Sequence, residues 1–297
     1  MTKEVVIISG KGGTGKTSLA AAFASLAQDA VLADCDVDAA DLHLLMNPRV
    51  LRKSDFSGGR LAAIDPHTCV GCGKCVTLCR FDAISLDGPG NDVVGKTYCV
   101  DPIACEGCKV CVEFCPAEAI TFEPAINGQW FVSETRFGPM VHARLGIAQE
   151  NSGKLVTLIR KEAKRIAEEQ HKHLLIVDGS PGIGCPVIAS ITGADVVLIV
   201  TEPTLSGLHD LERVGQLTRN FGIKTLVCIN KADINPQMSD QIIHDAEKQD
   251  LTVIGQLPYD DAFTKAQVMK ATLMEYTGGE IAEQIKTLWR QIVYAAG

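Results

Sequence analysis

The sequence predicts an α/β protein, in which a mostly parallel β-sheet carries helices on both faces and a small α+β unit is inserted. Short apolar segments alternate with amphipathic ones along the C-terminal half, and a glycine-rich loop joins the first strand-like segment to the first helical one. A cysteine-rich block interrupts this alternation at residues 65–122. Because apolar strands alternating with helices are typical of parallel sheets covered on both faces, the block is predicted to be a separate insert.

The elements of the sheet follow from hydrophobic periodicity. The apolar residues 4–9 predict a strand, the alanine-rich residues 18–28 a helix, and residues 31–34 a second strand. Beyond the cysteine-rich block we expect strands at 129–133, 140–143, 173–178, 195–201, 224–230 and 252–256, and helices at 154–170, 206–220, 237–248 and about 279–295. These elements predict one discontinuous domain, residues 1–64 and 123–297, that carries the insert at 65–122.

The bulk composition is that of an ordinary globular protein. The 297 residues are 46% hydrophobic and 22% charged, and this length suits two domains or one large domain with an insertion. The formal net charge of −8 argues against nucleic-acid binding, for which a basic surface is expected. No apolar run is long enough for a bilayer and no signal-peptide pattern is present, so we expect a cytoplasmic protein that does not bind membranes.

The loop GKGGTGKT satisfies the phosphate-binding pattern G-x-x-x-x-G-K-[ST] between the first predicted strand and helix. Its backbone N–H groups can surround phosphate oxygens, Lys16 can reach the β- and γ-phosphates, and the Thr17 hydroxyl can bind Mg²⁺. The predicted nucleotide-binding residues here are Gly10, Lys11, Gly12, Gly13, Thr14, Gly15, Lys16, Thr17 and Ser18.

The additional lysine, Lys11, makes KGGTGKT resemble the deviant Walker A motif of the MinD/Mrp/nitrogenase-iron-protein class of ATPases. The resemblance implies Mg²⁺-dependent ATP binding, slow or partner-stimulated hydrolysis, and a homodimer or a heterodimer with a related ATPase. It also implies that Lys11 crosses the dimer interface and supplies charge to the transition state at the partner's nucleotide.

Two aspartates at strand ends match the switch positions of this class. Asp36 is the candidate for orienting the attacking water or Mg²⁺, and Asp178, in LLIVDGSPG, for the Mg²⁺ shell. Asp34 could take the first role in place of Asp36, or could cap a helix, and an aspartate at a strand end is often only a turn former. With Lys11 and Lys16, Asp36 and Asp178 form the predicted catalytic set.

Three further residues resemble the contacts of this class with adenine: Asn230, Pro258 and Asp260. The segment Asn230–Asp233, NKAD, also resembles the N-K-x-D that binds guanine in GTPases, so GTP is the alternative nucleotide. The family resemblance favours ATP.

The cysteine-rich insert is an internal repeat. IDPHTCVGCGKCVTLCRFDAISL, residues 64–86, matches VDPIACEGCKVCVEFCPAEAITF, residues 100–122, at a shift of 36 residues. Eight of the twelve cysteines fall in these two CxxCxxCxxxC patterns, which in a cytosolic protein point to metal.

The patterns resemble those of bacterial ferredoxins with two [4Fe–4S] clusters, in which the fourth cysteine of each repeat binds the other cluster. The resemblance implies one cluster on Cys69, Cys72, Cys75 and Cys115, and a second on Cys105, Cys108, Cys111 and Cys79. The first repeat has Arg80 where the second has the usual proline, Pro116. Zinc on four cysteines is one alternative, and clusters with a purely structural role are another.

Cys185 lies seven residues after Asp178, where the nitrogenase iron protein has a cluster-ligating cysteine. A metal site that bridges two subunits is therefore conceivable, and a cysteine packed in its loop is the alternative.

The leading hypothesis is an ATPase that couples nucleotide-dependent dimerisation to electron transfer through two [4Fe–4S] clusters to a redox partner protein. An iron–sulfur cluster carrier or assembly scaffold is one alternative, and a MinD-like, ATP-switched organiser of partner proteins is the other.

Overall fold

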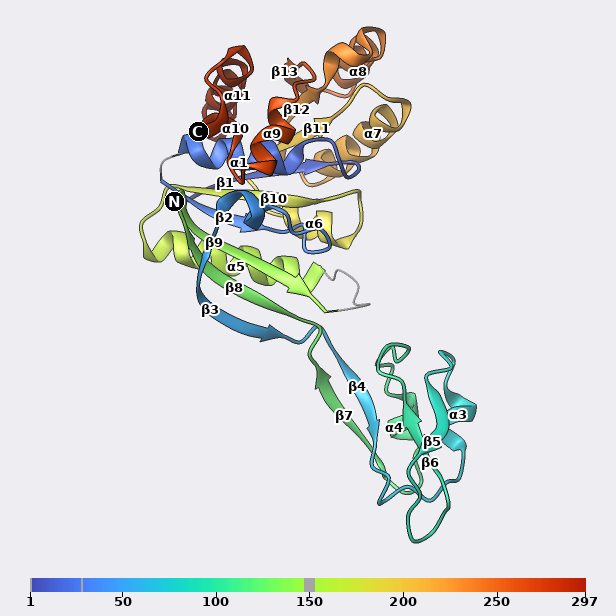
Figure 1. The fold of residues 1–297 in the computed structure, drawn as a ribbon. Helices are drawn as coiled ribbons and strands as arrows, with labels where there is room; N and C mark the ends of the chain where they lie inside the picture. The colour runs from blue at the N-terminus through green and yellow to red at the C-terminus, as the bar shows by residue number, and fades with distance from the viewer. Residues whose placement is uncertain (1, 28, 147–152) are drawn as a thin grey trace. The chain divides into compact units, whose positions relative to one another are not determined.

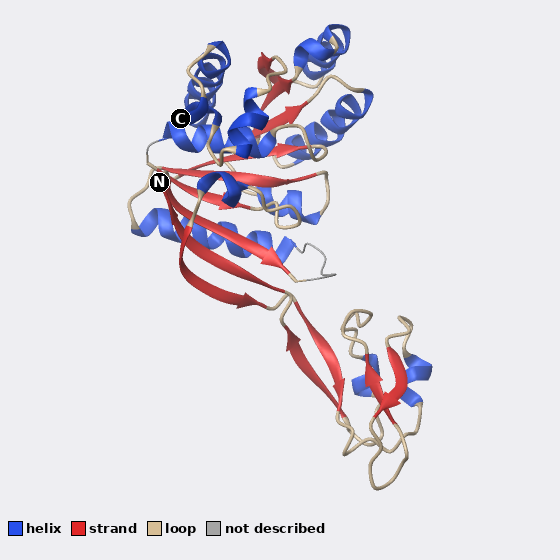
Figure 2. Ribbon diagram, viewed as in Figure 1, coloured by secondary structure: helices blue, strands red, loops and turns tan. Residues whose placement is uncertain are grey.

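The computed structural model describes residues 2–27, 29–146 and 153–297. The chain forms two compact units, one of residues 1–54, 130–144 and 151–297 and the other of residues 55–129 and 145–150. Each unit contains both helices and strands (Figures 1 and 2).

The first unit is built on a nine-stranded sheet in the order β13-β12-β11-β1-β10-β2-β9-β8-β3. The strands are β1 (Lys3–Ser9), β2 (Ala30–Asp34), β3 (Arg49–Phe56), β8 (Gly128–Thr135), β9 (Gly138–Leu145), β10 (Leu174–Pro181), β11 (Val196–Thr201), β12 (Lys224–Asn230) and β13 (Thr252–Leu257). All pairs from β13 to β9 are parallel, so the prediction of a mostly parallel α/β sheet is confirmed. Strand β3 was not expected, and it lengthens the sheet beyond β8.

Helices cover both faces of this sheet (Figure 1). They are α1 (Lys16–Ala27), α2 (Leu42–Met46), α5 (Gly153–Glu169), α6 (Cys185–Ile191), α7 (Leu205–Asn220), α8 (Pro236–Lys248), α9 (Ala262–Val268), α10 (Leu273–Tyr276) and α11 (Glu280–Ala296), with a 3₁₀ turn at Ala232–Ile234. Val5 and Ile7 join the core cluster formed with α1 and α11, while Val6 and Ile8, equally buried, point to the other face because side chains alternate along a strand.

The last helix, α11, buries one apolar side in this core. Trp289 stacks on Phe23 of α1 with ring centroids 5.3 Å apart, and Ile285 and Ile292 are completely buried. Among the described residues, no helix combines the length and the apolarity needed to cross a membrane.

The second unit consists of two antiparallel strand pairs and two short helices. Strand β4 (Gly59–Ile64) pairs with β7 (Ile120–Ala125), and β5 (Ile84–Gly88) pairs with β6 (Thr97–Val100). The helices are α3 (Lys74–Leu78) and α4 (Val110–Glu113). Because β4 begins before the cysteine-rich block and β7 continues beyond it, the unit is longer than residues 65–122.

The two sequence repeats are interlocked by reciprocal hydrogen bonds. Asp65 N–H donates to the Ala119 carbonyl at 2.8 Å, and Asp101 N–H donates to the Ala83 carbonyl at 2.8 Å. These two bonds are equivalent under the shift of 36 residues. The beginning of each repeat is thus tied to the end of the other, so the two repeats form one structure.

Candidate functional site

The phosphate-loop residues lie where three neighbouring parallel strands end. Strand β1 ends at Ser9 and β2 at Asp34, and Asp178 of β10 is the register partner of Asp34. The loop of residues 10–15 then leads directly into α1 at Lys16. Carboxyl ends of parallel strands meet at one edge of a sheet, which is where open α/β proteins bind ligands.

Lys16 is the centre of a buried group of charges. Its Nζ lies 2.6 Å from Asp178 Oδ1 and 3.3 Å from Asp36 Oδ2, and the Lys16 side chain is only 5% exposed. Burial acts to lower the pKa of Lys16, but the neighbouring Asp178 and Asp36 outweigh burial and raise it. The structure thus brings together three of the four predicted catalytic residues, because Lys16 forms ion pairs with both Asp36 and Asp178.

Several buried oxygen atoms at this edge lack a hydrogen-bond partner within the described chain: Thr14 Oγ1, Asp34 Oδ2 and Asp178 Oδ2. Asp34 uses its other oxygen, Oδ1, to accept a hydrogen bond from Asp36 N–H at 3.2 Å, so it shapes a turn and caps no helix. Burial and the nearby Asp178 raise the pKa of Asp34 well above its ordinary value. Unpartnered carboxylate oxygens are the ligands that a hard cation prefers, and the site therefore fits Mg²⁺.

We expect the Asp34→Asn variant, without nucleotide or Mg²⁺, to be more stable than the natural protein by about 1–3 kcal/mol at pH 7, because the neutral amide does not incur the cost of burying a carboxyl group beside Asp178. The pKa of Asp34 in the folded protein lies above its ordinary value of 3.8. The folded state therefore binds more protons, and Asp34 destabilises less as pH falls toward 3.8. Urea unfolding between pH 4.5 and 7 measures both effects.

The control for that experiment is Asp240→Asn, at an exposed position of α8. It should change neither the stability at pH 7 nor its dependence on pH. An Asp34→Asn protein that is less stable at pH 7 would show that the Asp34 carboxylate has a stabilising role in the empty site.

Asn230 is bound to the phosphate loop itself. Its Nδ2 donates to the Thr14 carbonyl at 2.8 Å, and its Oδ1 accepts from Lys231 N–H at 3.0 Å. A Cβ on Gly15, which has φ +92°, would lie 2.4 Å from Asn230 Nδ2, so this position requires glycine. Asn230 is predicted to lie beside adenine. In the structure it contacts the phosphate loop, and both polar atoms of its side chain are hydrogen-bonded to the protein.

The other two residues predicted beside the base follow β13. Tyr259 N–H, between Pro258 and Asp260, donates to Asp233 Oδ1 at 2.6 Å, which joins this segment to the NKAD segment. Asp260 Oδ1 accepts from Ala262 N–H at 2.8 Å at the start of α9. The sequence-predicted base contacts therefore come from two connected loops.

A second charged group surrounds the other predicted lysine of the loop. Lys11 Nζ lies 2.5 Å from Glu202 Oε1 and donates to Ser206 Oγ at 3.0 Å. Glu202 Oε2 lies 3.2 Å from Lys231 Nζ, which also donates to the Gly13 carbonyl at 3.1 Å. Glu202 and Ser206 were not predicted from the sequence, and Lys231 was noted only within the NKAD segment. Glu202 and Lys231 directly follow strands that end at the same edge of the sheet.

Cys185 is exposed and begins α6, so its side chain is not packed inside the loop. Within residues 2–27, 29–146 and 153–297, no three His, Cys, Asp or Glu side chains gather closely enough to hold a metal ion. The idea of a metal site at Cys185 thus depends on a second subunit.

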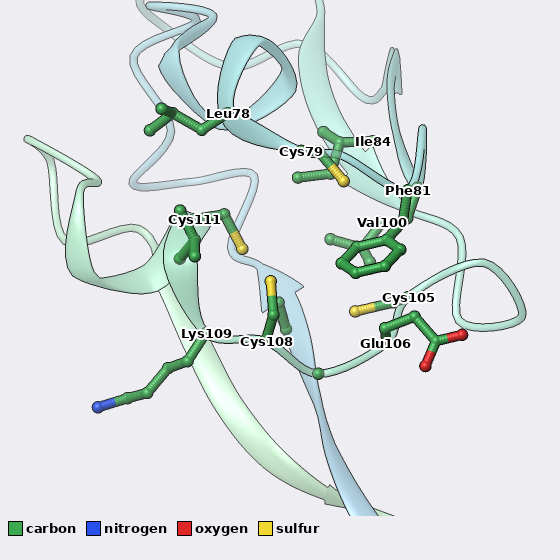
Figure 3. A pocket seen from close by; sticks show the side chains of 14 residues that line it. Leu78, Cys79, Phe81, Ile84, Val100, Cys105, Glu106, Cys108, Lys109 and Cys111 are labelled. Atoms are coloured by element: carbon green, nitrogen blue, oxygen red, sulfur yellow. The ribbon is translucent and has the colours of Figure 1, made fainter.

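The eight repeat cysteines line two pockets of the second unit. One pocket is lined by Cys79, Cys105, Cys108 and Cys111, and Figure 3 shows their sulfur atoms facing the space between them. The other is lined by Cys69, Cys72, Cys75 and Cys115. Each pocket has three cysteines of one repeat and the fourth cysteine of the other.

The rest of each pocket wall is largely apolar. Leu78, Phe81 and Val100 lie around the first pocket (Figure 3), and Ile64, Tyr98 and Ile120 around the second. A four-iron cluster is larger than a single ion, so its ligands stand apart around a space. Four thiols around a space with an apolar wall fit such a cluster, because the apolar surroundings limit its contact with water.

One thiol in each pocket, Cys75 and Cys111, has a raised pKa. Burial raises the pKa of Cys75 to about 11, and burial together with the neighbouring Cys105 and Cys108 raises the pKa of Cys111. A bound metal centre deprotonates its thiol ligands outright. A metal centre bound in these pockets would therefore lower the pKa of both thiols.

The backbone of the two cysteine loops is the same. Gly71 and Gly107, which precede the second cysteine of each loop, both have a positive φ, of 67° and 63°. Gly73 and Lys109, which follow that cysteine, have φ 74° and 69°. A Cβ on Gly107 would lie 2.2 Å from the Arg60 carbonyl, so only glycine fits there.

Comparison with known proteins places this architecture in a family. Residues 5–273 match the model of the CobQ/CobB/MinD/ParA nucleotide binding domain. The chain is 32% identical over 294 residues to the uncharacterized protein MJ0578 of Methanocaldococcus jannaschii, covering 97% of this chain and 96% of that protein. It is also 27% identical over 115 residues to MJ0579 of the same organism, covering 39% of this chain and 41% of that protein.

Solved structures share the fold at low sequence identity. MinD from Pyrococcus horikoshii, solved with Mg-ADP, has a TM-score of 0.58 and 15% identity over 100% of this chain and 98% of its own. The cell division ATPase MinD of Pyrococcus furiosus has a TM-score of 0.57 and 16% identity over 99% of both chains. The family match, over most of the chain and including the phosphate loop, shows that the protein belongs to the CobQ/CobB/MinD/ParA family of nucleotide-binding proteins, whose MinD and ParA members are P-loop ATPases.

Proposed function

We propose that this protein is an ATPase that couples nucleotide-dependent dimerisation to electron transfer through two [4Fe–4S] clusters held by the second unit. One observation carries the proposal. Two pockets each present four cysteines in the combination that a two-cluster ferredoxin requires, three from one repeat and one from the other. The second unit is then a ferredoxin domain inserted in a P-loop ATPase.

The eight cysteines would hold the clusters, which when bound store and pass single electrons. The protein's own residues bind and shield them. The repeated loops with left-handed residues on both sides of the second cysteine turn three sulfur atoms toward one space. The reciprocal bonds of Asp65 and Asp101 bring in the fourth sulfur from the other repeat, and the apolar walls would limit the contact of a bound cluster with water.

At the nucleotide edge, each predicted residue has a role that its position supports. The N–H groups of residues 10–15 and Lys16 would bind the phosphates, while Thr17 and the unpartnered oxygen of Asp178 would face Mg²⁺. Asp36, within 3.3 Å of Lys16, would orient water. Lys11 of a second subunit, from the same or a related chain, would complete the charge at the transferring phosphate, so hydrolysis without that partner would be slow.

A second candidate is an ATP-switched organiser of partner proteins, which the family membership favours. It uses the same nucleotide edge but gives the cysteine pockets no electron-transfer role. An iron–sulfur carrier differs from both candidates, because its cluster would be released to an apo-protein.

Anaerobic purification with iron and sulfide counts, followed by EPR of the reduced protein, tests the proposal. We expect about eight iron and eight sulfide atoms per chain, and an ATP-dependent change in the EPR spectrum or cluster potential that accompanies dimerisation. Zinc in place of iron would contradict the proposal. So would a protein with both clusters whose EPR spectrum, cluster potential and oligomeric state do not change when ATP is added. Release of iron to an apo-ferredoxin would instead support the carrier.

A further inference from the structure

Lys11, Glu202 and Lys231 form a row of alternating charge across the phosphate loop. Glu202 binds Lys11 through Oε1 at 2.5 Å and Lys231 through Oε2 at 3.2 Å. The Glu202 side chain is 15% exposed, against 35% for Lys11 and 30% for Lys231. Burial alone would raise the pKa of Glu202, but hydrogen bonds from both lysines outweigh it and lower the pKa, so the carboxylate is charged.

The carboxylate is held in place by the start of α7. Thr204 caps this helix, because its Oγ1 accepts from Gly207 N–H at 3.0 Å. A Cβ on Gly207 would lie 2.2 Å from the Glu202 carbonyl oxygen, so the turn between β11 and α7 is closely packed. Glu202 and Ser206 both contact Lys11 and therefore form a well-defined binding site for its ammonium group.

We propose that Glu202 is a positioning residue, which holds Lys11 within its own subunit until a second subunit binds and then keeps Lys231 as its partner. This inference rests on the proposed crossing of Lys11 to the nucleotide of a partner subunit. In the structure Lys11 is bound within its own chain, so its crossing must break the contacts with Glu202 and Ser206.

Lys231 lowers the cost of releasing Lys11 from Glu202. When one member of an ion pair leaves, the remaining buried charge is costly unless another partner is present. Lys231 is already bound to the second oxygen of Glu202 and is anchored to the Gly13 carbonyl at 3.1 Å. The departure of Lys11 thus leaves Glu202 paired, and a partly exposed pair is weak enough to be exchanged.

The first test is the dimerisation constant of full-length protein with a slowly hydrolysed ATP analogue, measured by analytical ultracentrifugation. Glu202→Gln should tighten the dimer about fivefold, since the partly exposed ion pair between Lys11 and Glu202 no longer has to be broken. In a Lys11→Ala background the same substitution should leave the dimerisation constant unchanged. If Glu202 had only a structural role, the substitution would change this constant with or without Lys11. Glu212→Gln, at an exposed position of α7, the helix that follows Glu202, is the matched control.

The second test needs no dimer. In the nucleotide-free protein, acylation of Lys11 by acetic anhydride, followed by mass spectrometry, should become severalfold faster in Glu202→Gln and remain unchanged in Glu212→Gln. An unchanged rate would overturn the inference whatever the oligomeric state. A natural protein that stays monomeric with ATP would instead overturn the proposed function, while faster labelling would still show that Glu202 retains Lys11.

Discussion

A Lys16→Ala protein is expected to bind Mg-ATP about a hundredfold more weakly than the natural protein, or not measurably. Hydrogen bonds to a charged group contribute about 1.5–3 kcal/mol each, and Lys16 is expected to make such bonds with the phosphates. Its ammonium also contacts two carboxylates, Asp36 and Asp178, with the completely buried Asp34 as a further neighbour. Without Lys16, an incoming triphosphate would meet these negative charges uncompensated.

Isothermal titration with ATP, with and without Mg²⁺, measures this loss. The same substitution leaves buried carboxylates unpaired, so circular dichroism must first show that the variant is folded. If it is not, Lys16→Ala combined with Asp178→Asn removes one of those charges, and its affinity is compared with that of Asp178→Asn alone, because Asp178 is itself proposed to face Mg²⁺. Lys161→Ala, at an exposed position of α5, should bind ATP normally. A folded Lys16→Ala protein whose affinity falls less than tenfold would contradict the assignment of the phosphate site.

The nucleotide edge was predictable from the sequence because its motif is local. One loop of eight residues between a strand and a helix determines where the phosphates bind, and apolar strands alternating with helices predict that β1, β10 and β2 end together. The structure adds the strand order and the register of Asp34 opposite Asp178, which residue spacing does not specify. Hydrophobic periodicity did not predict short helices such as α6 and α10. They have seven and four residues, which is too short for a helical pattern to be recognised.

The charged row of Lys11, Glu202 and Lys231 was not predictable in the same way. Its members are far apart in sequence, and although Lys11 belongs to a motif, Glu202 alone resembles an ordinary surface charge next to a loop. Asn230 shows the same limit. Its motif predicts a contact with the base, whereas the structure shows its amide bound to the Thr14 carbonyl of the phosphate loop. Interactions that join different strand ends depend on side-chain directions, which residue spacing does not specify.

The cysteine insert is the opposite case, since the repeat itself contains the long-range information. Two equal patterns 36 residues apart imply two equal substructures, and the reciprocal bonds of Asp65 and Asp101 show how the substructures exchange their ends. The two pockets nevertheless differ at their walls. Phe81 lines the pocket of Cys108, whereas the equivalent Ala117 lines the pocket of Cys72. If the pockets hold the proposed clusters, we expect the two to have different potentials, because apolar surroundings and solvent access tune a cluster.

Substitution of Cys79 is expected to remove the cluster site that is built mainly from the second repeat. Cys79 belongs to the first repeat but lines the pocket of Cys105, Cys108 and Cys111. Iron in anaerobically prepared Cys79→Ser protein should fall from about eight to about four atoms per chain. Cys99→Ser is the matched control, because Cys99 lies in the same unit, hydrogen-bonded to Ser85, and lines neither pocket.

Pairs of substitutions separate the two ways of assigning the fourth cysteine. Cys79→Ser with Cys108→Ser affects both repeats but only one pocket, so about four iron atoms should remain. Cys79→Ser with Cys72→Ser affects a single repeat but both pockets, so almost no iron should remain. The reverse outcome would mean that each repeat binds its own cluster, against the interlocked geometry of Asp65 and Asp101. Because both double variants replace two cysteines by serine, a general loss of stability would lower iron in both alike and could not produce the expected difference.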